Sequence, residues 1–221
     1  LQDRRPGAED ITFRHLASHT AGLIREPTWP ESVVGPIEAW EDRILQSIPQ
    51  TAYDSIPGAR YQYSNIGFGI LGLALARAAG RPFMDLVEEE IFAPLGMSDT
   101  SFHVPADKLD RFAACYVPTA EGPIKQEDSS GSDSLFAQPA VAYSGGGGLV
   151  STQDDYLRFC QMMLNGGELG GARLLGRKTV ELMRMNHLPG DMASMGQASF
   201  SETSYEGHGF GLGFSVVLDP A

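Results

Sequence analysis

The sequence predicts a mixed α+β protein in which helices outnumber strands. Several segments carry apolar residues at helical spacing between clear start and stop signals. One segment, residues 207–218, alternates in the manner of a β-strand. The 221 residues are 42% hydrophobic and 20% charged, so the chain can bury a core and differs from a disordered tail.

A short helix is predicted over residues 11–19. Within it Phe13, Leu16 and Ala17 recur at helical spacing and are expected to face inward. The turn-forming residues that follow are expected to end this helix. A second, amphipathic helix is predicted over residues 36–48, because its apolar side chains fall on one face and a proline stands in its first turn.

The strongest helical signal covers residues 65–79. Ser64 is placed to cap its N-terminus, and Gly80 follows its last residue, where glycine readily adopts the left-handed conformation that ends helices. Because the segment is apolar on nearly every side, we expect it to be buried all round. The next helix is predicted over residues 82–92, with Pro82 in its first turn and its end before the next proline.

Residues 118–139 are rich in Pro, Gly, Ser and Asp and predict a long surface loop. Beyond it, Ser151 and Asp154 resemble the capping box that starts a helix, which would end at Asn165. Another helix is predicted over residues 177–186. The apolar face of the first of these two helices is expected to comprise Tyr156, Leu157, Phe159, Cys160, Met163 and Leu164.

Residues 207–218 are predicted to form a single strand. Its large side chains alternate with glycines, so one face would let another backbone, a helix or a ligand approach closely. A strand of this length without a partner in the chain would be an exposed edge.

The charge balance excludes some classes of function. Sixteen Lys and Arg face 28 Asp and Glu, for a net charge of −12 and a pI near 4.7. That balance argues against nucleic acid and against anionic membrane surfaces as partners. No stretch approaches the ~20 apolar residues of a membrane-spanning helix. The two cysteines form no motif, and the compartment stays open, with the cytoplasm slightly favoured over the periplasm.

Two motif matches are better explained by structure than by chemistry. Gly67, Gly69 and Gly72 form a GxGxxG pattern, but no buried strand precedes it, so we expect helix packing rather than a dinucleotide site. His15 and His19 are spaced like a zinc pair, but the catalytic Glu of HExxH is absent and local hydrogen bonds are favoured. No metal ion or organic cofactor is implied.

The tripeptide Tyr63-Ser64-Asn65 carries the chemical hypothesis. It lies just before the helix predicted to be most buried, and Tyr63 and Asn65 are spaced so that both can project toward one side. A tyrosine beside a cation can act as a general base, and an amide can orient a substrate. The alternative is a helix-capping serine next to a packed tyrosine.

Four motifs occur in order along the chain. Together they resemble the serine β-lactamase-like, penicillin-binding-protein-like superfamily, which includes class C β-lactamases, D-alanyl-D-alanine carboxypeptidases and family VIII carboxylesterases. Residues 145–187 are most similar to the family VIII esterases. The motifs are H-x-x-S-H-T-A-G-L (15–23), P-G-A-R-Y-x-Y-S-N-x-G-F-G-I-L-G (57–72), I-F-A-P-L-G-M-S-D-T (91–100) and G-G-G-G-L-V-S-T-Q-D-D-Y-x-R-F (145–159).

The resemblance implies a β-lactamase-like fold. Residues 1–144 would form mostly its helical subdomain, and residues 145–221 part of its α/β subdomain with an antiparallel sheet, incomplete at both ends. It also implies a three-part site, made of S-x-x-K, Y-x-N and a third motif such as K-T-G, H-x-G or W-G-G. Tyr63 would be the base or proton relay, and Asn65 would orient the substrate.

This sequence carries only the middle part of that site. None of its lysines, Lys108, Lys125 and Lys178, has a serine three positions earlier. We therefore expect the nucleophile and the third motif to lie outside an internal piece of a longer enzyme. The expected activity is that of a carboxylesterase on small acyl esters.

The alternatives are a β-lactamase, a D-alanyl-D-alanine carboxypeptidase, or a catalytically silent fragment or binding module. The expected partners are a small ester or lactam substrate and the remaining segments of the same fold, in cis or in trans.

Overall fold

The structure is a computed structural model that describes residues 8–25, 55–119, 122, 125–128, 131–140, 143–197, 199–200 and 203–218. The described residues form helices and four two-stranded antiparallel sheets, which confirms the predicted mixed α+β class. The helix predicted over residues 36–48 lies outside this part of the chain. None of the described helices is long and apolar enough to cross a membrane.

Helix α1 (Phe13–Ala17) is shorter than predicted, because His19 adopts the left-handed conformation (φ 56°) just beyond it. Leu16 is buried and Ala17 is half-buried, as expected. Phe13 is 58% exposed, however, so its predicted inward position is wrong. A helix of five residues is little more than one turn and buries only a narrow stripe.

Helix α3 (Asn65–Ala79) has the predicted bounds and both predicted caps. The Ser64 hydroxyl accepts a hydrogen bond from the backbone N–H of Gly67 at 3.1 Å, and Gly80 is left-handed (φ 65°). The expected burial on every side is wrong. Only the first half of the helix is buried and Leu75 is 45% exposed, because the last turns extend past the segments that cover the first.

The glycines of α3 serve close packing, as predicted. A Cβ atom on Gly72 would lie 3.0 Å from the backbone nitrogen of Gly145, and one on Gly145 would lie 2.5 Å from the carbonyl oxygen of Phe68. Residues 59–64, which precede the helix, form no strand, so the context of a dinucleotide site is absent there.

The next helix runs further than predicted. It begins as α4 (Phe83–Val87), widens into the π-helical turn η5 (Glu88–Phe92) and continues as α5 (Ala93–Leu95). It passes through Pro94 and stops at Gly96, which is left-handed (φ 66°). In a regular α-helix the proline ring would clash with a carbonyl one turn earlier, and the wider π turn precedes this position.

Helix α6 (Gln153–Leu164) starts one residue later than predicted. Its N-cap is Thr152, whose hydroxyl accepts a hydrogen bond from the backbone N–H of Asp155 at 3.3 Å, and not Ser151. Helix α7 (Arg177–Met183) confirms the last predicted helix in a shorter form.

The main core lies where α6 meets α5, the turn before it and α7. Of the predicted apolar face of α6, Met163 is buried, but Tyr156, Leu157 and Leu164 are 63%, 63% and 72% exposed. These three side chains therefore correct the prediction: they point away from the core of the described residues. The buried members of this core are Phe92, Leu95, Met97, Met162, Met163 and Val180.

The predicted loop over residues 118–139 is wrong in part. Strand β1 (Cys115–Val117) pairs with β2 (Lys125–Asp128) in an antiparallel hairpin with an irregular register at its start. The other short pairs are β3 (Glu168–Leu169) with β4 (Ala172–Arg173) and β5 (Ser199–Phe200) with β6 (Thr203–Ser204). The 3-10 helices are η1 (Ala8–Asp10), η6 (Ala106–Arg111), η7 (Gly131–Asp133) and η8 (Leu135–Ala137).

The single strand predicted over residues 207–218 is instead a hairpin. Strand β7 (His208–Phe210) pairs with β8 (Ser215–Val217), so the segment supplies its own partner. The predicted close approach to its glycines is confirmed. A Cβ atom on Gly211 would lie 2.2 Å from the carbonyl oxygen of Met183, at the end of α7.

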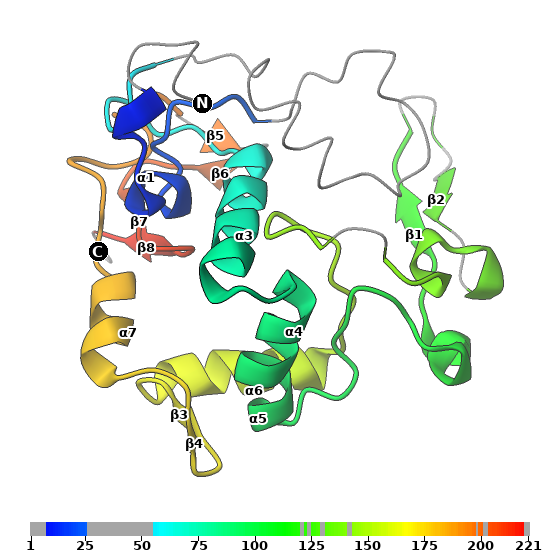
Figure 1. Ribbon diagram of the computed structural model, residues 1–221. Coiled ribbons are helices and arrows are strands. Elements are labelled where there is room, and N and C mark those ends of the chain that lie inside the picture. Colours follow the sequence, from blue (N-terminus) through cyan, green and yellow to red (C-terminus); the bar gives the residue numbers. More distant parts are fainter. Residues whose placement is uncertain are drawn as a thin grey trace.

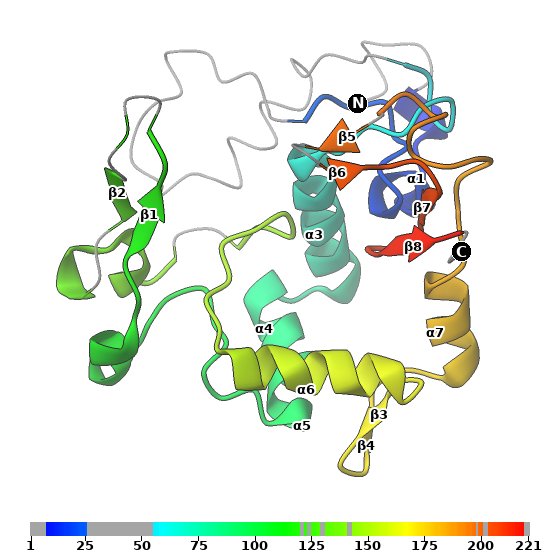
Figure 2. The same ribbon diagram turned by 180° about the vertical axis from the view of Figure 1, so that it is seen from behind.

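Figures 1 and 2 show how these elements surround α3. Helix α1 and the β7–β8 hairpin lie on one side of it, and α4, α5 and α6 lie near its C-terminal end. In both views the β1–β2 hairpin stands apart, on the side opposite α7. The start of α3 therefore lies next to α1 and the C-terminal hairpin, and this is where the predicted site residues are found.

Candidate active site

The Tyr63-Ser64-Asn65 segment is the transition from extended chain to helix. The backbone is extended at Ser64 (φ −139°, ψ 109°), and α3 begins at Asn65. Ser64 is 3% exposed, and its hydroxyl donates a hydrogen bond to the carbonyl oxygen of Ile24 at 2.8 Å. Tyr63 and Asn65 are half-buried. The two predicted site residues therefore stay accessible on either side of a serine that is fixed inside.

One edge of this extended segment is held by the loop that ends at Gln197. The backbone N–H of Tyr61 donates to the carbonyl oxygen of Met195 at 3.0 Å. The backbone N–H of Tyr63 donates to the side-chain oxygen of Gln197 at 3.2 Å. No motif marks Gln197, which lies 134 residues from Tyr63, so sequence reasoning missed this contact.

The opposite edge is held by His19. Its carbonyl oxygen accepts a hydrogen bond from the backbone N–H of Gln62 at 2.9 Å, and its Nδ1 atom accepts one from the backbone N–H of Ser64 at 3.1 Å. The segment is thus bound alternately on its two edges, as the central strand of a sheet would be. The backbone N–H of Asn65 then donates to the carbonyl oxygen of Arg25 at 2.9 Å.

The imidazole of His19 is 4% exposed and is enclosed by aromatic rings. Burial lowers the pKa of His19 to about 4, because the charged form would lose its hydration. The ring is neutral at pH 7, so its Nδ1 atom is free to accept the hydrogen bond from Ser64. The surrounding rings are those of Tyr61, Tyr63, Phe68 and Phe210.

The Tyr63 ring is in contact with an imidazole and with a guanidinium. Its centroid is 4.5 Å from that of His19, and the guanidinium carbon of Arg25 is 5.6 Å from it. The second distance is within the range of a cation–π contact. Arg25 therefore supplies a positive charge beside the predicted base.

The two histidines that are spaced like zinc ligands, His15 and His19, each accept a backbone hydrogen bond, which is the interpretation that the sequence favoured. The Nδ1 atom of His15 accepts a hydrogen bond from the backbone N–H of Thr12 at 3.3 Å, which completes the cap of α1. His19 lies beyond the end of that helix, so the two imidazoles do not share one helix face. Among the described residues there is no cluster of three or more potential metal ligands.

Serines close to the site are bound in the structure. Ser18 is 1% exposed and donates its hydroxyl hydrogen to the carbonyl oxygen of Arg14 at 2.8 Å. Ser64 makes the capping contacts described above. Lys178 and Thr179 match the first two residues of a K-T-G motif, but Val180 replaces its glycine. Lys178 lies on α7 with its side chain 91% exposed and forms an ion pair with Glu181. These groups do not form a nucleophile with its lysine.

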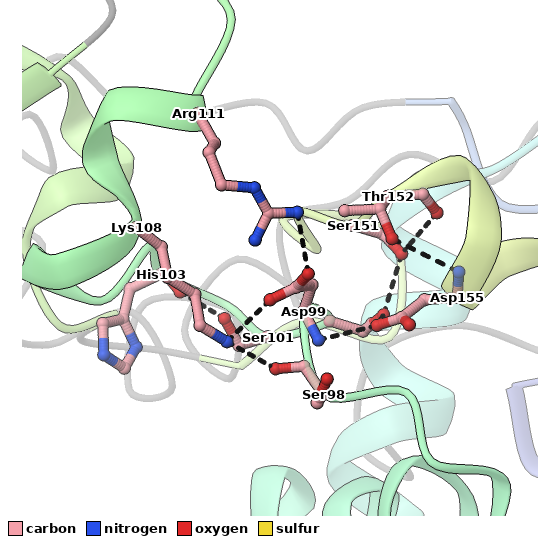
Figure 3. A network of polar contacts seen from close by, with 10 residues as sticks. Ser98, Asp99, Ser101, His103, Lys108, Arg111, Ser151, Thr152 and Asp155 are labelled. Carbon is pink, nitrogen blue, oxygen red and sulfur yellow. Dashed lines mark hydrogen bonds and ion pairs between the residues drawn. The ribbon is translucent and has the colours of Figure 1, made fainter.

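A second polar cluster lies at the start of α6 and is structural (Figure 3). The buried carboxylate of Asp155 accepts hydrogen bonds from the backbone N–H of Asp99 at 2.7 Å and from the hydroxyl of Thr100 at 3.0 Å. Hydrogen bonds from Arg111 and Lys108 lower the pKa of Asp99 to about 2. Each acidic group has a bonding partner here, and the cluster joins α6 to the segment after α5.

The described elements have the fold of the β-lactamase-like class, with the predicted Tyr-x-Asn at the start of the central helix. A model of the family described as Beta-lactamase matches residues 1–217, and the chain belongs to this family.

Relatives with curated descriptions are longer than this chain. It is 32% identical over 233 residues to an uncharacterised protein of Mycobacterium tuberculosis (strain CDC 1551 / Oshkosh), covering 100% of this chain and 55% of that protein. It is 31% identical over 157 residues to the D-alanyl-D-alanine-carboxypeptidase/endopeptidase AmpH of Escherichia coli K12, covering 70% and 37%. The chain thus spans about half the length, or less, of the curated relatives it matches.

Solved structures share the fold. EstCE1, a hydrolase with promiscuous acyltransferase activity, superposes with a TM-score of 0.68 at 26% identity, over 93% of this chain and 56% of that one. Simvastatin synthase (LovD) from Aspergillus terreus superposes with a TM-score of 0.71 at 25% identity, over 99% and 55%.

Proposed function

We propose that this chain supplies the Tyr-x-Asn part of the active site of a serine hydrolase that acts on small acyl esters through a covalent acyl-enzyme. Tyr63 is the general base, and Asn65 orients the acyl chain or the leaving group. The nucleophilic serine and the lysine of S-x-x-K lie outside the 221 residues. The observation that carries the proposal is the fixed backbone around Tyr63, with Arg25 beside the ring.

The proton path follows from these roles. Tyr63 takes the proton from the serine hydroxyl as its oxygen forms a bond to the ester carbonyl carbon. The same proton passes to the alkoxide when the carbon–oxygen bond of the ester breaks, so the alcohol leaves neutral. Water then attacks the acyl-enzyme along the reverse path and releases the carboxylic acid and the serine. A base that is held in place before the reaction needs little reorganisation during it.

Two structural relatives favour acyl esters as substrates. EstCE1 is described as a hydrolase with promiscuous acyltransferase activity, and LovD as simvastatin synthase. Both superpose over more than nine-tenths of this chain. A carboxypeptidase or β-lactamase activity is the second candidate, supported by the identity to the carboxypeptidase/endopeptidase AmpH.

The test replaces Tyr63 by Phe in the intact protein. We expect kcat/KM on a short-chain nitrophenyl ester to fall at least ~10²-fold, the usual scale of an acid–base contribution. Tyr61→Phe is the matched control and should leave kcat/KM nearly unchanged. It also removes a phenol hydroxyl, but Tyr61 is two residues earlier in the sequence and only 2% exposed. Burial raises the pKa of the Tyr61 phenol, which makes it unfit as a base. Near-normal activity in Tyr63→Phe would overturn the assignment.

A second measurement separates the esterase proposal from a catalytically silent or binding role. The intact protein is incubated with the same ester, quenched and digested, and the acylated peptide is located by mass spectrometry. We expect one acylated serine, followed three residues later by lysine, outside the 221 residues. An adduct on a serine of this sequence would contradict the placement of the nucleophile. The absence of any adduct, together with no turnover of the ester or of a D-alanyl-D-alanine peptide, would favour the silent role.

A further inference from the structure

We propose that His19 is a positioning residue for Tyr63, which it holds in reactive alignment by accepting a backbone hydrogen bond on each side of it. This inference rests on the function proposed for Tyr63. It extends that proposal, because it names the residue that fixes the position of Tyr63, the proposed base.

The two acceptors of His19 lie on either side of the tyrosine in the sequence. The carbonyl oxygen binds the N–H of Gln62 and the Nδ1 atom binds the N–H of Ser64, at 2.9 and 3.1 Å. The imidazole also packs against the ring of Tyr63, with 4.5 Å between centroids and 38° between planes. One residue therefore fixes the backbone before and after Tyr63 as well as one face of its ring.

The backbone of His19 is shaped for this contact. His19 is the only residue other than glycine with positive φ in the part of the chain that the structure describes. Such a conformation is costly for most side chains, and Asn tolerates it better than others. The turn is closed by a hydrogen bond from the N–H of Thr20 to the carbonyl oxygen of His15 at 2.9 Å. The end of α1 thus presents both acceptors of His19 to the same extended segment.

The contact requires a neutral imidazole. Only an unprotonated Nδ1 atom can accept the hydrogen bond from Ser64, so the hydrogen of the neutral ring is on Nε2. The titratable groups packed against the ring are the phenols of Tyr61 and Tyr63, and the Arg25 guanidinium lies over the Tyr63 ring. The α3 and β7 sides contribute the rings of Phe68 and Phe210, which do not titrate. A proton on Nδ1 would replace the hydrogen bond by repulsion from the N–H of Ser64.

The test compares two substitutions of His19 in the intact protein. His19→Asn keeps an acceptor, because its side-chain oxygen is bonded to Cγ as Nδ1 is, and it suits the left-handed backbone. His19→Phe keeps a ring and removes the acceptor. We expect His19→Asn to retain kcat on the nitrophenyl ester within ~3-fold and His19→Phe to lose at least ~10-fold in kcat with little change in KM, since a small misplacement of a catalytic group is costly.

The pH profile of kcat, measured per folded molecule at each pH, is the readout that a purely structural role would not move, because loss of folded protein is then already accounted for. In the wild type we expect an additional loss of kcat as the pH falls through about 4, where His19 takes up its proton. In His19→Asn this loss should be missing, because the amide does not titrate. The comparison needs no His19→Phe protein, so it decides the matter if that variant does not fold.

The outcomes separate this inference from the proposed function. Normal kcat in a folded His19→Phe, while Tyr63→Phe is inactive, would overturn the role of His19 alone. A loss in His19→Asn equal to that in His19→Phe, or an unchanged acid limb in His19→Asn, would also overturn it. Normal turnover in Tyr63→Phe would overturn the proposed function and this inference with it.

Discussion

Gly72 and Gly145 approach each other so closely that a Cβ atom on Gly72 would lie 3.0 Å from the backbone nitrogen of Gly145. A helix and a tight turn that are far apart in the sequence meet here without side chains between them. The next residue, Gly146, makes a similar approach, since its Cβ atom would lie 2.7 Å from the carbonyl oxygen of Asn65. The glycine segment therefore packs along the first half of α3, up to the predicted site.

The first prediction concerns this contact. We expect Gly72→Ala to lower the free energy of unfolding by about 1–3 kcal/mol, the usual cost of overpacking, because the backbone of Gly145 blocks the added methyl group. Gly69→Ala is the control on the same helix. Its Cβ atom would lie 3.7 Å from the Ser144 hydroxyl, an ordinary contact, so the better helix propensity should leave stability unchanged or raised by up to about 1 kcal/mol. Equal losses in urea unfolding would contradict the packing described here.

The second prediction concerns the buried carboxylate at the start of α6. Asp155→Ala leaves the N–H of Asp99 without its acceptor. It also removes the acceptor of the Thr100 hydroxyl, which keeps its hydrogen bond with the hydroxyl of Ser151. We expect a loss of about 1–3 kcal/mol in the free energy of unfolding, the scale of an unsatisfied buried donor. Asp154→Ala removes a carboxylate from the same helical turn, but that residue is exposed, so its effect should be much smaller. If thermal unfolding shows the same loss for both, the cluster does not anchor the helix.

The third prediction is a pH dependence of stability caused by His19. Folding lowers the pKa of its imidazole from 6.5 to about 4, so between these values the unfolded chain binds a proton that the folded chain does not. Stability is therefore fully present above pH 6.5, falls as the pH drops toward 4, and loses about 3 kcal/mol in total by linkage. Urea unfolding at pH 7 and pH 4.5 measures the loss. His19→Asn should abolish most of it and His15→Asn should not, so a slope that persists in His19→Asn would refute the assignment.

The features that the sequence predicted well depend on near neighbours. The bounds of α3 follow from Ser64 at one end and Gly80 at the other, and both act within a single helical turn. The mixed α+β class and the resemblance to the β-lactamase-like superfamily were likewise predictable, because ordered motifs carry them. The division at residue 144 stays a prediction, as do the catalytic roles of Tyr63 and Asn65.

The predictions that failed needed information that the spacing of apolar residues does not carry. Alternation over residues 207–218 is the same for one strand as for a tight hairpin, so it does not locate the turn that pairs β7 with β8. The hydrogen bond from the backbone N–H of Tyr63 to the side chain of Gln197 joins residues 134 positions apart, and no sequence motif marks it. The same holds for the exposed apolar side chains of α6. The spacing of apolar residues predicts which side of a helix they share, but not whether another segment covers that side.

The last prediction tests whether the cap of α3 matters for the chemistry as well as for the helix. Ser64→Ala removes the acceptor for the N–H of Gly67 and the donor to the carbonyl of Ile24, and should cost about 1–2 kcal/mol, as a lost N-cap does. Thr152→Ala removes the equivalent cap of α6, away from Tyr63, at a similar cost. We expect both variants to be destabilised in thermal unfolding, but only Ser64→Ala to lose kcat, because its cap adjoins the base. Equal turnover in the two folded variants would show that the backbone contacts from His19 and Gln197 suffice to hold Tyr63, and that the Ser64 hydroxyl serves the helix alone.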